Sequence, residues 1–234
     1  MTLAQQLTNY QSTRSLGSWF RQRRSQHLRS LLVDCHAVYG HVNVIDIGGR
    51  PSYWNIFPKQ LFNKLKVRVL LVNNGEEIPS DQMDSRFQQV EADACHLEQF
   101  NGNQFHLAHS NSVIEHVGSW RRMQLFAAET QRIARTYYLQ TPNFNFPIEP
   151  HYMLPFFHWL PEALRAKMLQ KRRLGHIGRE TDIVQAMNAI QSIQLLNKTM
   201  VSGLFPDARI EQEKILGLCK SLIAIRGLSE EVKN

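Results

Sequence analysis

The sequence has few cysteines, no long apolar run and no recognisable secretory leader. No apolar run approaches the roughly 18 residues that cross a bilayer. The first residues, M-T-L-A-Q-Q-L, lack the charged-then-apolar order of a secretory signal. Cys35, Cys95 and Cys219 are odd in number and far apart, which argues against a disulfide framework. We therefore expect a cytoplasmic protein.

Zinc-finger spacing, an RNA-binding aromatic signature, internal repeats and low-complexity segments are also absent from the sequence. The net charge is +7, and basic residues crowd the N-terminal segment and residues 167–173. Such clusters are either solvated faces or contacts for nucleic acid, anionic lipid or a phosphorylated substrate. Because no nucleic-acid motif accompanies them, we favour solvated faces and expect neither a nucleic-acid partner nor a metal site.

Residues 42–54, V-N-V-I-D-I-G-G-R-P-S-Y-W, organise the rest of the sequence. A short apolar strand surrounds Asp46, Gly48 and Gly49 end it, and a helical segment begins near Trp54. This is the opening unit of an open α/β nucleotide-binding sheet. Glycines let the backbone approach a ligand closely, and a following helix offers unpaired N–H groups. For this stretch taken alone, an ordinary strand-to-helix turn is the alternative.

Strands and helices alternate through the first 140 residues. The apolar pattern predicts further strands at 67–72, 87–92, 105–109 and 137–140, and helices at 27–39, 56–65 and 120–133. Gly40 suits the end of the first helix, Gly17 and Ser18 are expected to separate it from an earlier one, and Pro58 fits a first turn. This alternation predicts a parallel sheet that binds its ligand at the carboxyl ends of the strands.

Residues 142–180 break the alternation, because prolines there are interleaved with aromatic residues. We interpret this segment as a cap, inserted after the fifth strand and placed over the ligand edge. A proline-rigid packing insert is one alternative, and a peripheral membrane contact at residues 153–159 is another. After the cap we expect a helix at 181–197, begun by Thr181 or Asp182, and a terminal hairpin of strands 208–214 and 221–226.

The order of elements resembles the class I S-adenosylmethionine-dependent methyltransferases, especially the bacterial type 11-like group, over residues 40–226. The motifs that carry it are V-I-D-I-G-G, E-A-D-A, H-S-N-S-V-I-E-H-V, Q-T-P-N-F-N-F-P-I-E-P-H-Y, F-P-D-A and K-S-L-I-A-I-R. The resemblance implies an α/β, Rossmann-like sheet of seven mostly parallel strands with helices on both faces. Its final strand runs antiparallel, inserted between two parallel ones. Residues 1–40 are then a helical extension and 41–234 the methyltransferase domain.

The resemblance implies S-adenosylmethionine as cofactor and places its contacts at the ends of the first four strands. The backbone at Gly48 and Gly49 would approach the methionine part. Asn73 falls where the family usually has an acid on the ribose hydroxyls, and Asp93 matches the acid that binds the adenine amino group. The implied contacts are Asp46, Gly48, Gly49, Asn73, Asn74, Asp93, Ala94, Ser110 and Asn111.

The sequence departs from the family pattern in this region. Arg50 and Ser52 replace later glycines of the first motif, so that loop must take another shape. Asn73 lacks the charge that strengthens ribose contacts, and Glu76 or Glu77 is a candidate to compensate for it. Two alternatives follow: a weakened cofactor site, and a non-catalytic protein that binds a partner through its cap and basic helices.

Methyl transfer is an in-line displacement at a sulfonium carbon, so alignment supplies much of the rate and a hydroxyl acceptor also needs a base. His116, after the fourth strand, is the first candidate base, with a helix-capping or core role as its alternative. Glu149 and His151 in the cap are the second candidates, with a salt-bridged hinge as their alternative.

We therefore predict methyl transfer to a small-molecule or carbohydrate-like acceptor, with oxygen favoured over nitrogen or carbon. The aromatic cap suggests an acceptor with an apolar or ring-shaped part. An RNA methyltransferase is a further alternative, motivated by the basic N-terminus. A homo-oligomer in which a neighbouring subunit completes the cap is left open.

Overall fold

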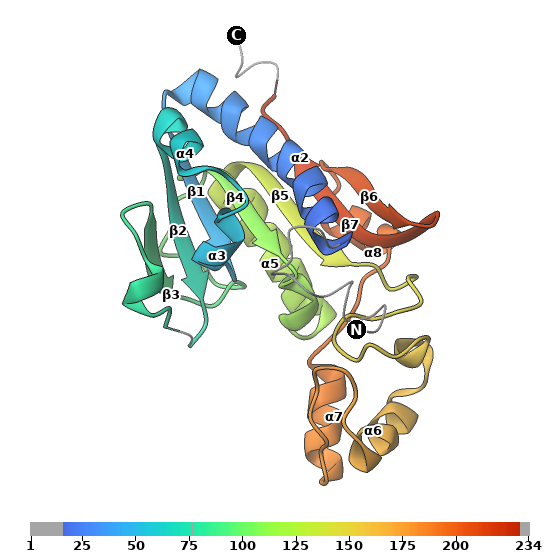
Figure 1. Cartoon of the computed structure of the whole chain (residues 1–234). Coiled ribbons are helices and arrows are strands. Elements are labelled where there is room, and N and C mark those ends of the chain that lie inside the picture. The colour runs from blue at the N-terminus through green and yellow to red at the C-terminus, as the bar shows by residue number, and fades with distance from the viewer. Residues whose placement is uncertain (1–15, 76, 230–234) are drawn as a thin grey trace.

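The strands of the chain form one mixed sheet. The computed structural model describes residues 16–75 and 77–229, with side chains from residue 26 onward. In these residues, seven strands lie in the order β3-β2-β1-β4-β5-β7-β6 (Figure 1). They are β1 (Val42–Ile47), β2 (Val67–Asn73), β3 (Phe87–Glu91), β4 (Phe105–Asn111), β5 (Ala134–Pro142), β6 (Arg209–Ile215) and β7 (Leu218–Arg226).

Strands β1 to β5 are parallel, whereas β7 is antiparallel to both of its neighbours, β5 and β6. Strand β6 therefore runs in the same direction as β1 to β5. The predicted Rossmann-like sheet, with an antiparallel final strand between two parallel strands, is confirmed.

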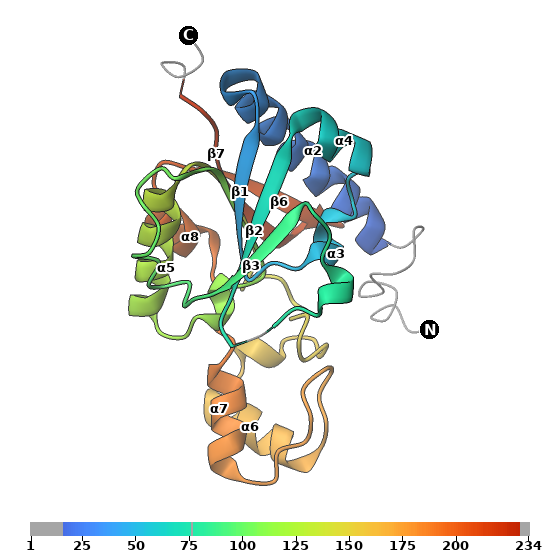
Figure 2. The same ribbon diagram turned by 90° about the vertical axis from the view of Figure 1, so that its left-hand side faces the viewer.

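Helices cover both faces of the sheet, as predicted (Figure 2). They are α2 (Leu16–Tyr39), α3 (Pro51–Trp54) and α4 (Lys59–Leu65) on one face, and α5 (Trp120–Ile133) and α8 (Lys198–Leu204) on the other. Successive strand residues point to opposite faces. In β1, Val44 packs into the core under α2 to α4, and Ile45 and Ile47 pack into the core under α5 and α8.

The first helix is longer than predicted. Helix α2 runs without a break from Leu16 to Tyr39, so the predicted separation at Gly17 and Ser18 is wrong. A glycine inside a helix costs only about 1 kcal/mol relative to alanine, and packing on the sheet supports the rest of α2. Gly40 follows the helix with a φ of 71°, the left-handed backbone of a helix C-terminus. The predicted earlier helix lies outside the described residues.

The predicted helix at 56–65 is shorter in the structure, and a separate short helix precedes it, so the helical segment expected to begin near Trp54 begins at Pro51 instead. Helix α3 ends at Trp54, and α4 starts at Lys59 with Pro58 as its N-cap rather than in its first turn. The residue before a proline is disfavoured in helical backbone, so Phe57 cannot carry a helix into Pro58. None of the described helices combines the length and apolar character needed to cross a membrane.

The helix predicted at 181–197 is also shorter in the structure. Helix α7 (Ile183–Gln191) begins at the predicted N-cap Asp182, whose side chain accepts a hydrogen bond from Gln185 N. Beyond α7, the Gln194 and Leu196 backbones pair with the sheet domain, which holds this segment extended. Asn197 then caps α8, a helix that the pattern did not predict.

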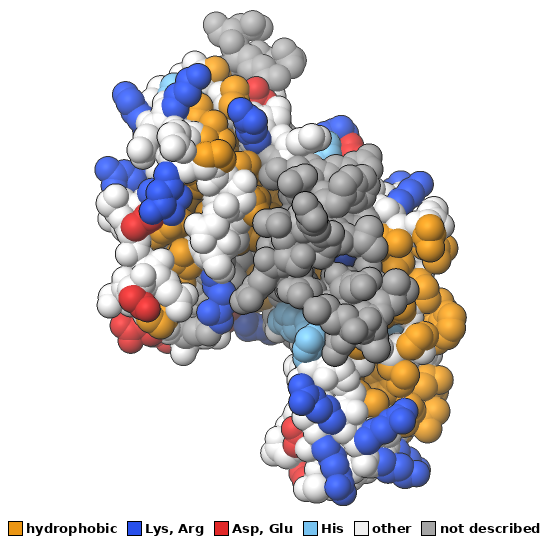
Figure 3. Space-filling view, viewed as in Figure 1, with side chains coloured by type: hydrophobic (Ala, Val, Ile, Leu, Met, Phe, Trp, Pro, Cys, Tyr) orange, Lys and Arg blue, Asp and Glu red, His pale blue; other side chains and the backbone are white. Residues whose placement is uncertain are grey.

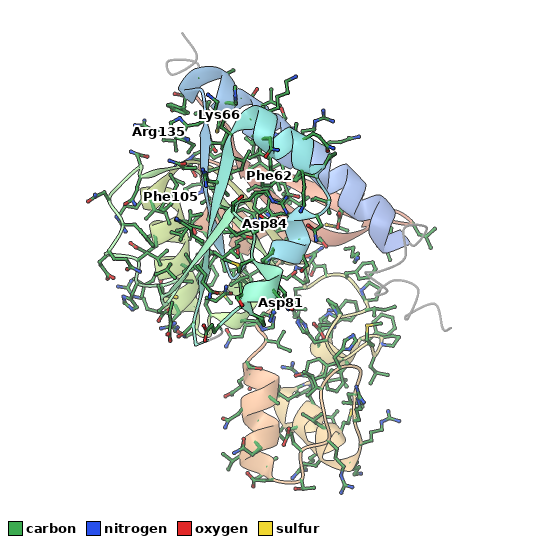
Figure 4. The ribbon with its side chains drawn as sticks, turned by 60° about the vertical axis from the view of Figure 1, so that its left-hand side comes forward. Phe62, Lys66, Asp81, Asp84, Phe105 and Arg135 are labelled. Carbon is green, nitrogen blue, oxygen red and sulfur yellow. The ribbon has the colours of Figure 1, made fainter. Side chains whose placement is uncertain are left out.

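The cap and α7 form a lobe with a core of its own. It contains α6 (Glu162–Lys171) and the 3-10 turn η3 (Phe157–Trp159). Its buried core consists of Tyr152, Phe157, Ala166, Leu169, Leu174, Ala186, Ile190 and Ile193. In Figure 4, Lys66 and Arg135, which lie at the starts of β2 and β5, are far from the lobe, whereas Asp81, which follows β2, is near it. The lobe therefore lies beyond the carboxyl ends of the strands.

Candidate functional site at the carboxyl edge

At the end of β1, the Asp46 carboxylate is fully buried and bonded through both oxygens. Trp54 Nε1 donates to Oδ2 at 2.7 Å, and His109 Nδ1 donates to Oδ1 at 2.6 Å. His109 faces Asp46 because the two residues are paired in the β1–β4 register. Asp46 thus joins β1, β4 and α3, and it offers no exposed oxygen to a ligand.

The two glycines after β1 allow close packing of the loop. Gly48 has a φ of 71°, and a Cβ there would lie 2.4 Å from Val113 Cγ2. A Cβ on Gly49 would lie 1.9 Å from Asp46 Oδ2. The Gly48 N–H donates to Val72 O at 2.7 Å, and Asn73 Nδ2 donates to Gly49 O at 3.1 Å. Backbone and side-chain bonds within the chain therefore hold this loop.

An open hollow of about 350 Å³ lies at the carboxyl ends of β2 and β3. Its lining residues are Asn73, Gly75, Glu77, Gln89, Val90 and Glu91. The two carboxylates and two amides there carry acceptors of the kind that bind sugar hydroxyls. Asn74 is exposed beside the hollow, and Glu76 lies outside the described residues.

Beyond β3, the Asp93 carboxylate is held by Arg122 and by a backbone amide. Arg122 Nη2 lies 2.8 Å from both carboxylate oxygens, and Cys95 N donates to Oδ1 at 2.9 Å. Partial burial opposes ionisation, but these donors outweigh it and hold the pKa of Asp93 below its usual value. Within the described residues, Oδ2 accepts only from Arg122, so it keeps capacity for another donor. The neighbouring Ala94 packs half-buried against the core.

The end of β4 is hydrogen-bonded to the end of β1. Ser110 is buried, and its Oγ donates to Ile47 O at 3.0 Å. Asn111, the last residue of β4, is half-buried. Ser112 follows with a φ of 56°, and its Oγ donates to Gln140 Oε1 at 3.1 Å. The polar groups predicted at this edge therefore serve partly to fix the strand ends.

The three predicted acid–base residues meet in one hydrogen-bonded chain between η2 (Ile114–His116) and the cap. Glu149 is buried, and its Oε1 accepts a hydrogen bond from His151 Nδ1. His151 Nε2 lies 3.1 Å from His116 Nε2, and His116 Nδ1 donates to Ser192 O at 3.3 Å. The order of the chain is Glu149, His151, His116 and the Ser192 carbonyl.

This chain fixes where its protons are. A carboxylate and a carbonyl only accept, so both Nδ1 atoms carry hydrogen, and one more hydrogen lies between the two Nε2 atoms. The two rings then carry one proton more than two neutral imidazoles. Burial opposes the charge on His151, but Glu149 outweighs it and raises the pKa of His151. Partial desolvation of its ring, and then His151, lower the pKa of His116, although the residue is exposed. His116 is therefore the neutral acceptor of the pair.

Glu115 adds a fully buried carboxyl group beside this chain. Thr141 Oγ1 donates to its Oε2 at 2.9 Å, and its Oε1 has no hydrogen-bond partner in the described residues. Burial raises the pKa of Glu115 from 4.5 to about 7. Within the described residues, no group of three or more His, Cys, Asp or Glu side chains is placed to hold a metal ion.

A small cleft of about 60 Å³ lies between the ends of β4 and β5, the cap and the β6–β7 hairpin. Its polar side consists of Ser112, Gln140, Asn143, Lys220 and Ser221. Its apolar side consists of Pro142, Phe146, Ile148, Pro150, Met153 and Ile215. Pro150 stands between Glu149 and His151 in the sequence, so the cleft adjoins the histidine chain.

The residues present fit an adenosine-bearing cofactor at two places. One is the hollow at Asn73, and the other is Asp93, whose Oδ2 can accept a further hydrogen bond. Both Asp46 oxygens and the Gly48 N–H are already hydrogen-bonded to other groups of the protein. Sequence reasoning missed Glu115 and His109. Both carried a signal: Glu115 lies inside the apolar run V-I-E-H-V, and His109 directly follows Leu107 and Ala108 in a predicted strand.

By sequence, the chain matches no protein-family model and no curated protein. Among solved structures, it is similar to an O-methyltransferase family protein from Burkholderia thailandensis, with 13% identity over 91% of this chain and a TM-score of 0.48. The chain spans 60% of that protein. A SAM dependent methyltransferase from Archaeoglobus fulgidus has 11% identity, coverage of 91% and 100% of the two chains, and a TM-score of 0.49.

Magnesium protoporphyrin IX methyltransferase from Synechocystis, with bound SAH, has 12% identity, coverage of 90% and 84% of the two chains, and a TM-score of 0.48. Likeness at this level assigns no activity, substrate or cofactor to the chain. The strand order and the antiparallel last strand are what give this chain the predicted class I methyltransferase fold.

Proposed function

We propose that the protein transfers a methyl group from S-adenosylmethionine to a hydroxyl oxygen of a small-molecule acceptor. The observation that carries this proposal is the Glu149–His151–His116 chain at the carboxyl edge of a methyltransferase-type sheet. Asn73, Glu77 and Asp93 are the residues that would hold the cofactor. When bound, it supplies an electrophilic methyl group on a sulfonium.

The histidine pair supplies the base. When both rings are neutral and both Nδ1 atoms carry hydrogen, the two Nε2 lone pairs face each other across 3.1 Å. An acceptor hydroxyl that approaches the two Nε2 atoms from the side can give up its proton to His116 as its oxygen is methylated. The pair then holds the shared proton, and Glu149 stabilises the resulting positive charge. His116 is exposed and the His151 side chain is 25% exposed, so an acceptor can reach them.

The adjoining cleft supports an acceptor with both an apolar part and hydroxyl groups. Ser112 Oγ and the Gln140 amide form a polar side that can orient hydroxyls, whereas Phe146, Ile148 and Met153 form an apolar wall. With a volume of about 60 Å³, the cleft can take only one edge of such an acceptor, for example one side of a ring that bears hydroxyls. Binding on both sides would align the acceptor oxygen for in-line attack, which supplies much of the rate.

Loss of either histidine should slow methyl transfer. His116→Ala and His151→Ala are each expected to lower turnover about 10²-fold or more, because a positioned base contributes at least that much. The wild-type rate should rise with pH, since only the neutral pair accepts a proton. The assay follows labelled methyl transfer from S-adenosylmethionine to a panel of sugars and ring alcohols. His176→Ala, at an exposed histidine of the cap, is the control. Unchanged turnover in both His116→Ala and His151→Ala would contradict the base role.

A second candidate function is a non-catalytic binding protein with the same fold. The Gly48 amide donates within the chain, and both Asp46 oxygens are occupied by Trp54 and His109. These bonds favour a loop that is stable without a cofactor. Cofactor binding separates the two candidates, since the non-catalytic protein need not bind S-adenosylmethionine or its product.

A further inference from the structure

Large apolar side chains are exposed along one edge of the molecule, formed by the cap and the β6–β7 hairpin. The side chains of this apolar edge are Phe144, Phe156, Trp159 and Leu164 of the cap and Leu216 and Leu218 of the hairpin. Figure 3 shows hydrophobic side chains gathered on this side, from the hairpin down along the cap. Single exposed apolar residues are ordinary, but a gathered set marks an interaction surface.

Two of these residues are held outward by unfavourable backbone. Phe156 has a φ of 62° and is 54% exposed, and Leu216 has a φ of 49° and is 98% exposed. Left-handed backbone is unfavourable for a bulky residue. The Phe156 N–H donates to Pro147 O at 2.7 Å, which keeps this conformation in place. The fold thus presents two apolar side chains to solvent at a cost that glycine or asparagine would avoid.

The aromatic members of the edge have the character of residues at a membrane interface. The Phe156 and Trp159 ring centroids lie 5.1 Å apart, and Trp159 Nε1 donates to Phe144 O at 2.9 Å. The indole is therefore satisfied at its polar end and exposed at its apolar body. Tryptophan and phenylalanine on a protein surface favour the boundary between lipid headgroups and acyl chains.

The cap and the hairpin parts of the edge adjoin each other. Ile148 and Met153 of the cap and Ile215 of the hairpin line the same cleft, the one beside the histidine chain. Ile215 immediately precedes Leu216, and Ile148 is bridged to Pro155, the residue before Phe156. A flat partner that contacted Phe156 and Leu216 together would therefore also cover the neighbourhood of this cleft.

Basic side chains flank the apolar edge. Lys167, Lys171, Arg172 and Arg173, at the end of α6 and just beyond it, are exposed, as is Lys214 on the hairpin. Figure 3 shows Lys and Arg side chains on the lower part of the lobe, next to the hydrophobic ones. Each basic residue near an anionic leaflet adds to membrane affinity. Apolar anchors with a basic flank match an anionic bilayer in both chemistry and charge.

We propose that the apolar edge docks on the surface of an anionic lipid bilayer. Phe156, Trp159 and Leu216 enter the headgroup boundary, and the basic flank contacts lipid phosphates. Docking would bring the cleft beside the histidine chain to the membrane, where an amphiphilic acceptor is available. The docking itself requires neither the cofactor nor methyl transfer, so it stands or fails independently of the proposed function.

Vesicle binding tests this proposal. The purified chain is mixed with vesicles of phosphatidylcholine alone or with added phosphatidylglycerol, and binding is measured by flotation. We expect binding to the anionic vesicles that weakens with salt. Phe156→Asn and Leu216→Asn should each weaken it about tenfold or more, because each removes a large apolar side chain. Asparagine suits left-handed backbone, so these variants keep the fold.

Val33→Ser is the matched control, since Val33 is 43% exposed on α2, away from the apolar edge. Its binding should equal that of the wild type. Absent binding to anionic vesicles, equal binding to neutral and anionic vesicles, or wild-type binding by both asparagine variants would each overturn the proposal. A concentration-dependent dimer that Phe156→Asn dissolves, without vesicle binding, would assign the edge to a second copy of the chain instead.

Discussion

Replacing Asp46 with alanine should lower the free energy of unfolding by about 2–6 kcal/mol, because it leaves two buried N–H donors without an acceptor, at about 1–3 kcal/mol each. The variant leaves Trp54 Nε1–H and His109 Nδ1–H buried without an acceptor. The opposite ring nitrogen, His109 Nε2, already has no hydrogen-bond partner within the described residues. Chemical denaturation of the wild type and the variant at one pH measures the difference.

A double-mutant cycle assigns this loss to the hydrogen-bonded group. Trp54→Phe removes the indole donor of the same hydrogen bond. The loss of stability in the double variant should therefore be smaller than the sum of the two single losses, by about 0.5–3 kcal/mol. Asp81→Ala removes an exposed carboxylate of the 3-10 turn η1 (Ser80–Gln82) and should change stability by no more than about 0.5 kcal/mol. An Asp46→Ala effect as small as that of Asp81→Ala would refute the bonding described here.

Replacing Glu115 with glutamine should make the protein less sensitive to rising pH. Burial raises the pKa of this carboxyl from 4.5 to about 7, so the folded state keeps its proton after the unfolded state has lost it. The wild type therefore loses stability between pH 4.5 and about 7, by about 3 kcal/mol at about 1.36 kcal/mol for each pH unit. Glutamine does not ionise, so the variant should escape this loss.

The measured quantity is the difference between the unfolding free energies of Glu115→Gln and wild type. It should be constant below pH 4.5, increase in favour of the variant up to about pH 7, and stay level above that. Glu98→Gln serves as the control, because the Glu98 side chain is 76% exposed and is hydrated in both states. A difference that does not change across this range would contradict the burial of an ionisable Glu115.

Local chemistry explains which parts of the fold could be predicted from the sequence. Helix α5 starts and ends where predicted, because Ser119 supplies its N-cap and apolar residues recur at helical spacing. The prediction failed at Gly17 and Pro58. At Gly17, packing outweighs a weak helix-breaking preference, and at Pro58 the backbone restriction acts on the preceding residue. The bounds of α3, α4 and α8 depend on the balance between such local backbone preferences and packing in the folded protein.

The sequence supplied candidate residues for the site but not their arrangement. Parallel strands bring their carboxyl ends to one edge, which is why the polar groups after β1 to β4 gather there. The contact of His116 with His151 joins residues 35 positions apart and depends on how the cap folds. The Asp93–Arg122 pair spans 29 positions and could not be read from either segment alone.

Calorimetric titration with S-adenosylhomocysteine tests most directly the claim that this edge is a methyltransferase cofactor site. We predict a dissociation constant in the micromolar range, weakened about tenfold or more in Asp93→Ala and unchanged in the exposed control Asp81→Ala. His116→Ala should bind as tightly as the wild type, because its role is in the chemical step. No binding by a protein whose fold is verified by circular dichroism would contradict the claim and favour the non-catalytic binding protein.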